Sequence, residues 1–241
     1  DPQHHLLAMQ AVPQPHENWK TMLLAGRLDS HHVEQFAALL AAIHRRSAES
    51  GEPLREIFDD RSFFESLRVE PYYRYTAGRI PAAAPFLGAL IEKTDRVTET
   101  LVHGDFSPKN VLVHDGRLVL LDYEVAHFGD PAFDVGFSTA HLLSKANHLP
   151  ALKGAFVRAA AESWDAYRRE IDATSFGETS KPSKSSAGSP TFTDAMVQSS
   201  SAAGAKRPAR PTARSMMLAL ADWTLTVKIL LRSGATTTMC E

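Results

Sequence analysis

The chain has 241 residues, of which 44% are hydrophobic and 22% are charged, and its formal net charge is -2. This length suits one large or two modest domains, and the apolar content is sufficient for a buried core. The nearly balanced charge gives no global indication of binding to nucleic acid or to an acidic membrane surface.

Three helices are expected before residue 100. Asp29-Ser30 is a good N-cap, and residues at helical spacing follow it: Val33, Phe36, Ala37, Leu40, Ile43 and His44. Ser62-Phe63-Phe64-Glu65 predicts a capping box that opens a short helix. The aromatic segment 71–75 is interpreted as packing against the domain. Pro85 predicts the start of a helix that continues to about Thr98, with apolar side chains on one side.

The most informative segment is residues 101–124, LVHGDFSPKNVLVHDGRLVLLDYE. It contains two β-prone runs, 111–113 and 117–121, on either side of Asp115-Gly116. Asp-Gly is a strong hairpin signal because glycine tolerates the positive φ of a type I′ turn. The hairpin would return Asp122 to the neighbourhood of Asn110.

The polar residues of this segment have the spacing of a kinase catalytic loop and its metal-binding strand. Asn110 lies five residues after Asp105, and Asp122 lies twelve residues after Asn110. A carboxylate such as Asp105 can accept the proton of a phosphoryl acceptor hydroxyl. The amide oxygen of Asn110 and the carboxylate of Asp122 are hard ligands suited to Mg²⁺. The alternative is a surface hairpin with solvated acids.

Two further helices are expected after the hairpin, over 133–143 and from Pro150 to about Ile171. Residues 172–215 are dominated by Ser, Thr, Ala, Pro and Gly, so we interpret them as a disordered low-complexity linker. Its basic end is interpreted as a solvated charge run, with no nucleic acid expected. Residues 216–241 are interpreted as a possible terminal helix, over 216–231, and a tail.

From His103-Gly104-Asp105 to Asp134, the chain resembles the large, carboxy-terminal lobe of kinases of the aminoglycoside phosphotransferase and choline kinase type. The matching residues are His103, Gly104, Asp105, Asn110, Asp122 and the segment 129–134. The resemblance implies an α+β fold, a mostly helical protein-kinase-like large lobe with a catalytic-loop β-hairpin. It also implies an enzyme that uses ATP and Mg²⁺ to phosphorylate a hydroxyl group of a small molecule.

The resemblance assigns roles to individual residues. Asp105, Asn110 and His103 would be catalytic, and Asn110 and Asp122 would bind the metal. Asp134 would support the loop by hydrogen bonding. Four residues would contact ATP: Gln10 and Ala11 as a hinge along the adenine edge, and Leu112 and Leu121 as the floor of the adenine site. In related kinases a histidine packs beneath the catalytic region; His44 has this role or lies at the surface.

By the same resemblance, residues 1–18 are a remnant of a small lobe and hinge, and 19–171 are the large lobe. The sequence contains no G-x-G-x-x-G loop, and Lys20 follows the hinge-like segment, so Lys20 cannot be the strand lysine that holds the ATP phosphates. The chain is therefore expected to be truncated. As given, it is either inactive or dependent on its missing half. The alternative function is a non-catalytic, pseudokinase-like binding or scaffold fragment. The oligomeric state is left open.

A cytoplasmic location is expected. Cys240 is the single cysteine, so an intramolecular disulfide is excluded. The first residues show neither the basic nor the apolar region of a signal peptide. The apolar run 216–231 is interrupted by Asp222 and Lys228, which argues against a membrane span.

Overall fold

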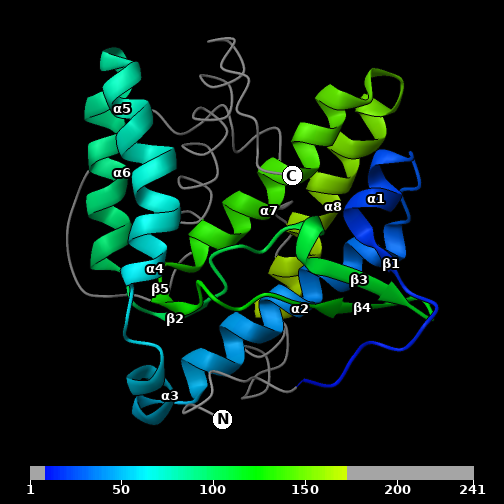
Figure 1. Ribbon diagram of the computed structural model, residues 1–241, viewed down its shortest axis with the longest axis horizontal. Helices are drawn as coiled ribbons and strands as arrows, with labels where there is room; N and C mark the ends of the chain where they lie inside the picture. The colour runs from blue at the N-terminus through cyan, green and yellow to red at the C-terminus, as the bar shows by residue number, and fades with distance from the viewer. Residues whose placement is uncertain (1–8, 173–241) are drawn as a thin grey trace, which may run out of the picture.

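A computed structural model of the chain describes residues 9–172. The expected low-complexity segment after Asp172 and the helix over 216–231 lie outside the described residues. The fold is mostly helical with two small sheets (Figure 1), so the expected α+β class is confirmed at that level. The α-helices are α1 (Trp19–Leu24), α2 (Ser30–Glu49), α3 (Glu52–Ile57), α4 (Ser62–Phe64), α5 (Tyr75–Arg79), α6 (Ala84–Arg96), α7 (Pro131–His148) and α8 (Lys153–Asp172).

The shorter elements connect these helices. A π-helix, η1 (Glu65–Arg74), joins α4 to α5, and single 3-10 turns form η2 (Pro81–Ala83), η3 (Pro108–Asn110) and η4 (Pro150–Leu152). The strands are β1 (Glu17–Asn18), β2 (Thr100–Val102), β3 (Val111–His114), β4 (Arg117–Leu120) and β5 (His127–Gly129). One sheet has the order β1-β3-β4, and β2 pairs with β5 in the other, with every pair antiparallel.

The predicted hairpin is confirmed. His114 pairs with Arg117 across a two-residue turn, and the turn residues Asp115 and Gly116 have φ of 48° and 71°. Positive φ at both central positions is the requirement of a type I′ turn, which Asp-Gly meets at low cost. The predicted N-cap of α2 is also present, since the Asp29 carboxylate accepts the backbone N–H of His31 at 2.9 Å.

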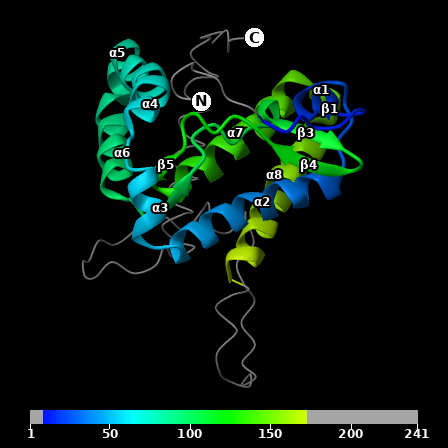
Figure 2. The ribbon, with the colours of Figure 1, turned by 60° about the horizontal axis from the view of Figure 1, so that its bottom comes forward.

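The larger core lies between α2, α7, α8 and one face of the β3–β4 hairpin (Figure 2). Phe36 lies at its centre, with its ring centroid 4.8 Å from Trp19 and 4.3 Å from Phe106. The helical spacing predicted for α2 and α8 is confirmed by the residues they bury: Val33, Phe36, Ala37, Leu40, Phe156, Ala160, Trp164 and Tyr167.

The smaller core lies between the α4–η1–α5 segment, α6 and the β2–β5 sheet, and includes Tyr73 of the aromatic segment. The predicted capping box at Ser62 is wrong. Asp60 accepts the backbone N–H of Ser62 at 2.8 Å, and the Glu65 carboxylate forms an ion pair with Arg74 instead. The helix then continues past residue 71, because a π-helical turn accommodates a proline that has no N–H to donate.

Helix α7 joins the two cores. The Asp130 side chain accepts the backbone N–H of Ala132 at 2.9 Å, which caps the first turn. Phe133 and Phe137 of α7 belong to the smaller core, whereas Leu142 belongs to the larger one. The helix therefore crosses the middle of the structure between the α5–α6 pair and α1 (Figure 1). None of the helices in residues 9–172 is long and apolar enough to cross a bilayer.

Candidate active site

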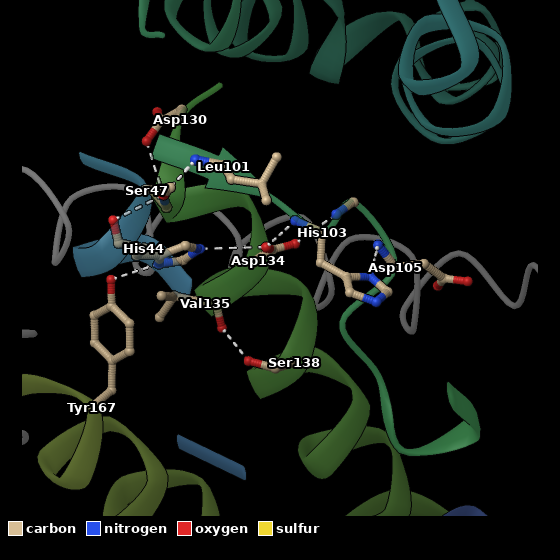
Figure 3. A network of polar contacts seen from close by, with 12 residues as sticks. His44, Ser47, Leu101, His103, Asp105, Asp130, Asp134, Val135, Ser138 and Tyr167 are labelled. Atoms are coloured by element: carbon tan, nitrogen blue, oxygen red, sulfur yellow. Dashed lines mark hydrogen bonds and ion pairs between the residues drawn. The ribbon is translucent and has the colours of Figure 1, made fainter. Parts of the chain in front are cut away.

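The loop that follows β2 is fixed by a carboxylate of α7 (Figure 3). Asp134 is fully buried and accepts two backbone N–H groups of the loop, from His103 at 2.6 Å and from Gly104 at 3.0 Å. Burial alone would raise the pKa of Asp134, but the hydrogen bond from His44, the charge that His44 and His103 carry whenever they are protonated, and the backbone hydrogen bond from His103 hold it below its ordinary value. The carboxylate is thus ionised and anchors the loop.

A second layer of side chains positions Asp134. The ring of His44, which is 1% exposed, contacts the carboxylate through Nε2 at 3.4 Å and the Tyr167 hydroxyl through Nδ1 at 2.9 Å. An ionised carboxylate only accepts hydrogen bonds, so Nε2 donates, and in the neutral ring Nδ1 accepts the Tyr167 proton. Of the two positions left open for His44, the structure therefore shows the buried one beneath the loop.

His103 joins the loop to the end of the hairpin. Its Nδ1 accepts the backbone N–H of Asp105 at 3.2 Å, so the neutral ring carries its proton on Nε2. That proton is donated to the backbone carbonyl of Leu121, 3.1 Å away. Because Leu121 directly precedes Asp122, His103 links the two segments that the sequence motif contains.

Gly104 is required by the space and the backbone geometry at this point. Its φ is +76°, a region that disfavours residues with a Cβ. A Cβ at this position would lie 2.9 Å from the carbonyl oxygen and from Cγ1 of Val125. The Gly104 carbonyl accepts a hydrogen bond of 2.7 Å from Nε of Arg68.

Asp105 is 3% exposed and is held by three donors, all of which contact Oδ2. Nη2 of Arg68 lies 3.1 Å away, Nζ of Lys109 lies 3.0 Å away, and Nδ2 of Asn110 donates at 2.8 Å. In the described part of the chain, no contact of comparable length falls on Oδ1. The carboxylate is therefore oriented through one oxygen.

Asn110 and Asp122 are brought to the same place by the hairpin register. Nδ2 of Asn110 donates to the Asp105 carbonyl at 3.0 Å, and its backbone carbonyl accepts the N–H of Leu121 at 2.8 Å. Asp122 follows at φ +68° and is exposed. Within residues 9–172, no group of three or more His, Cys, Asp or Glu is arranged to hold a metal. The side chains of Asn110 and Asp122 offer an amide oxygen and a carboxylate, the kinds of ligand that Mg²⁺ prefers.

The other predicted site residues lie around this centre. Leu112 and Leu121 are half-buried and lie with Val119 on one face of the hairpin. The residues that alternate with them point to the other face, which packs on the core: Val111, Val113, Leu118 and Leu120. Gln10 and Ala11 are exposed and lie before β1 without regular structure. No hydrogen bond within residues 9–172 joins them to the hairpin, although the nearby Pro15 carbonyl contacts Nδ1 of His114 at 2.8 Å.

Comparison with known proteins agrees with this arrangement. A model of the phosphotransferase enzyme family matches residues 10–170. The chain belongs to this family. Segments of 56 and 63 residues are each 41% identical to methylthioribose kinases, of Yersinia enterocolitica and of Citrobacter koseri. They cover 23% and 26% of the chain, and 14% and 16% of those relatives, so the chain matches only a small part of their length.

This match confirms the resemblance inferred from the motif. Sequence reasoning missed two residues that contact the Asp105 carboxylate, Arg68 and Lys109. Lys109 directly precedes Asn110, so the motif itself could have placed it close to Asp105. Arg68 had no such signal, because it lies 36 residues before Gly104 in a helix without a recognisable motif.

Proposed function

We propose that this chain carries the phosphoryl-transfer site of an ATP- and Mg²⁺-dependent kinase for a hydroxyl group of a small molecule. The observation that carries the proposal is the buried Asp105 carboxylate, oriented through one oxygen and bonded to Asn110, next to the strand end that presents Asp122. Membership of the phosphotransferase family supports the reaction class. The matched relatives are named as methylthioribose kinases, which supports a small-molecule substrate.

In this proposal Asp105 accepts the proton of the substrate hydroxyl as its oxygen attacks the γ-phosphorus of ATP. The new O–P bond forms while the bond to the β–γ bridging oxygen breaks, and ADP leaves with that electron pair. Asp105 then releases its proton to solvent. The transfer is direct, so the chain's contribution is to position the reactants and to balance their charge.

The other residues bind or position. Asn110 and Asp122 would hold Mg²⁺, which when bound stabilises negative charge on the phosphates. The amide nitrogen of Asn110 is engaged by Asp105, which leaves its oxygen as the ligand atom. His103 and Asp134 act as positioning residues. Leu112 and Leu121 would form the adenine floor, and Gln10 and Ala11 the hinge.

The first test is calorimetric titration of ATP into the purified chain with and without Mg²⁺. We expect binding that depends on Mg²⁺ and disappears in Asp122→Ala. Asp115→Asn is the matched control, because Asp115 is an exposed acid on the same hairpin and asparagine tolerates its positive φ. Asp105→Asn should bind ATP but transfer no phosphoryl group.

Two results would count against the proposal. Retained Mg²⁺-dependent binding in Asp122→Ala would remove that residue from the metal site. Absence of nucleotide binding by the unmodified chain would favour the alternative of a non-catalytic binding or scaffold fragment for the chain as given.

A further inference from the structure

Basic side chains gather beside the proposed reaction site. Arg68 and Lys109 both contact the Asp105 carboxylate. Lys20 lies on α1, which contacts both η3, where Lys109 is found, and α7, where Lys145 is found. We refer to Lys20, Arg68, Lys109 and Lys145 as the basic cluster.

Lys145 is the least expected member of the basic cluster. Its side chain is 5% exposed, yet it forms no ion pair with a carboxylate in residues 9–172. Burial, and secondly the charge of Lys20, lower its pKa to about 8, so the amine remains mostly protonated at neutral pH. A buried ammonium group without an anionic partner is unfavourable. An anion bound beside the amine would offset this cost.

The ring of His141 lies within electrostatic reach of all four members of the basic cluster. Burial lowers the pKa of His141 to about 3, and the charges of Lys145, Lys109, Lys20 and Arg68 act in the same direction. His141 is therefore neutral and adds no charge of its own. It contacts the Phe137 ring at 4.7 Å between centroids, and the Arg68 guanidinium lies 5.9 Å from that same ring.

The position of the basic cluster relative to Asp105 follows from α7. Asp134, His141 and Lys145 are separated by seven and four residues, so they lie on one face of the helix. Asp134 anchors the loop that carries Asp105, and Lys145 lies about three turns further along the same face. Asp105 engages Arg68 and Lys109, whereas Lys20 and Lys145 have no ion-pair partner in the described part of the chain.

We propose that the hydroxyl-bearing substrate also carries a carboxylate or phosphate group, which Lys145 and Lys20 bind while Asp105 faces the hydroxyl. The inference rests on the proposed function and names the substrate class of that site. Polycationic compounds such as aminoglycosides would be repelled by the same side chains. The phosphates of ATP are the other possible source of the anionic group, and the experiment separates the two.

The test uses the purified chain without nucleotide and matched neutral and anionic probes: ribose against ribose 5-phosphate, and glucose against gluconate. We expect calorimetry to show at least about tenfold tighter binding of one anionic probe than of its neutral partner. Lys145→Met should remove most of this preference, and Lys20→Gln should lower it. Lys153→Met, an exposed lysine at the start of α8, is the control that should leave it unchanged.

Binding of Mg²⁺ and ATP to Lys145→Met identifies the source of the anion. Unchanged nucleotide binding is expected, whereas its loss would assign the basic cluster to the nucleotide phosphates and overturn the inference. Equal binding, or no binding, of both members of each pair would also overturn it. The proposed function fails separately, through Mg²⁺-dependent ATP binding and its dependence on Asp122.

Discussion

Replacing Lys145 by methionine is expected to stabilise the free protein at neutral pH. Burial is the main cause that lowers the pKa of Lys145 from 10.5 to about 8, because folding removes the ammonium group from water. This difference corresponds to roughly 3 kcal/mol of folding free energy lost while the side chain is charged. Methionine keeps the length of the stem and removes the charge, so the packing of α7 is largely preserved.

The gain should depend on pH in a defined direction. Below pH 8 the Lys145 amine carries its proton in both the folded and the unfolded chain, so the whole free-energy cost of burying the charge is present. Between about pH 8 and 10.5 the unfolded chain binds more protons than the folded one, so the stability of the unmodified protein rises with pH. The advantage of Lys145→Met is therefore largest below pH 8 and shrinks as the pH approaches 10.5.

Urea unfolding across this pH range measures the difference in unfolding free energy, and thermal unfolding at pH 7 measures the accompanying change in Tm. A domain of this size changes its Tm by about 2–4 °C per kcal/mol, so we expect an increase of roughly 6–12 °C at pH 7. The exposed-site control, Lys153→Met, should stay within about 0.5 kcal/mol of the unmodified protein. A destabilised Lys145→Met protein at pH 7, or a gain that stays constant up to pH 10.5, would refute the reasoning.

Three further changes test the loop and its surroundings. Gly104→Ala should lose about 2 kcal/mol or more, because a Cβ would meet Val125 at positive φ; a loss below about 0.5 kcal/mol in urea unfolding would contradict the close approach. Asp134→Asn should lose roughly 1–3 kcal/mol and speed amide exchange in the loop, since the amide cannot accept both backbone N–H groups; unchanged exchange would argue against the anchor. Burial and the charge of Asp130 raise the pKa of Glu99, so the ionised carboxylate destabilises the folded protein at pH 7 and the protonated one does not at pH 4. Glu99→Gln should therefore stabilise the protein at pH 7 but not at pH 4, and equal effects at both pH values would contradict this.

Much of the fold could be predicted because its determinants are local. The N-cap at Asp29 and the Asp-Gly turn each depend on residues within a few positions of one another. The motif was likewise contiguous, and the hairpin register alone placed Asp122 near Asn110. At Asp29 and at the Asp-Gly turn, the residues of a short stretch of chain set the geometry.

The remainder could not be predicted because it depends on partners distant in sequence. Arg68 contacts Asp105, and His44 contacts both Asp134 and Tyr167, which lie 90 and 123 residues later. Such contacts arise from helix packing, which no local pattern encodes. The capping box failed for a local reason, since the Ser62 N–H, which a capping box donates to the Glu65 carboxylate, is donated to Asp60.

Helix α7 gives the proposed substrate site a fixed dimension. Asp134 holds the loop of Asp105, and Lys145 lies further along the same face of α7, so one rigid helix separates the two proposed contacts. An anionic substrate held at both ends must then match that separation. Hydroxy acids of increasing chain length should therefore show a single optimum of binding, whereas a diffuse basic surface would bind the whole series equally.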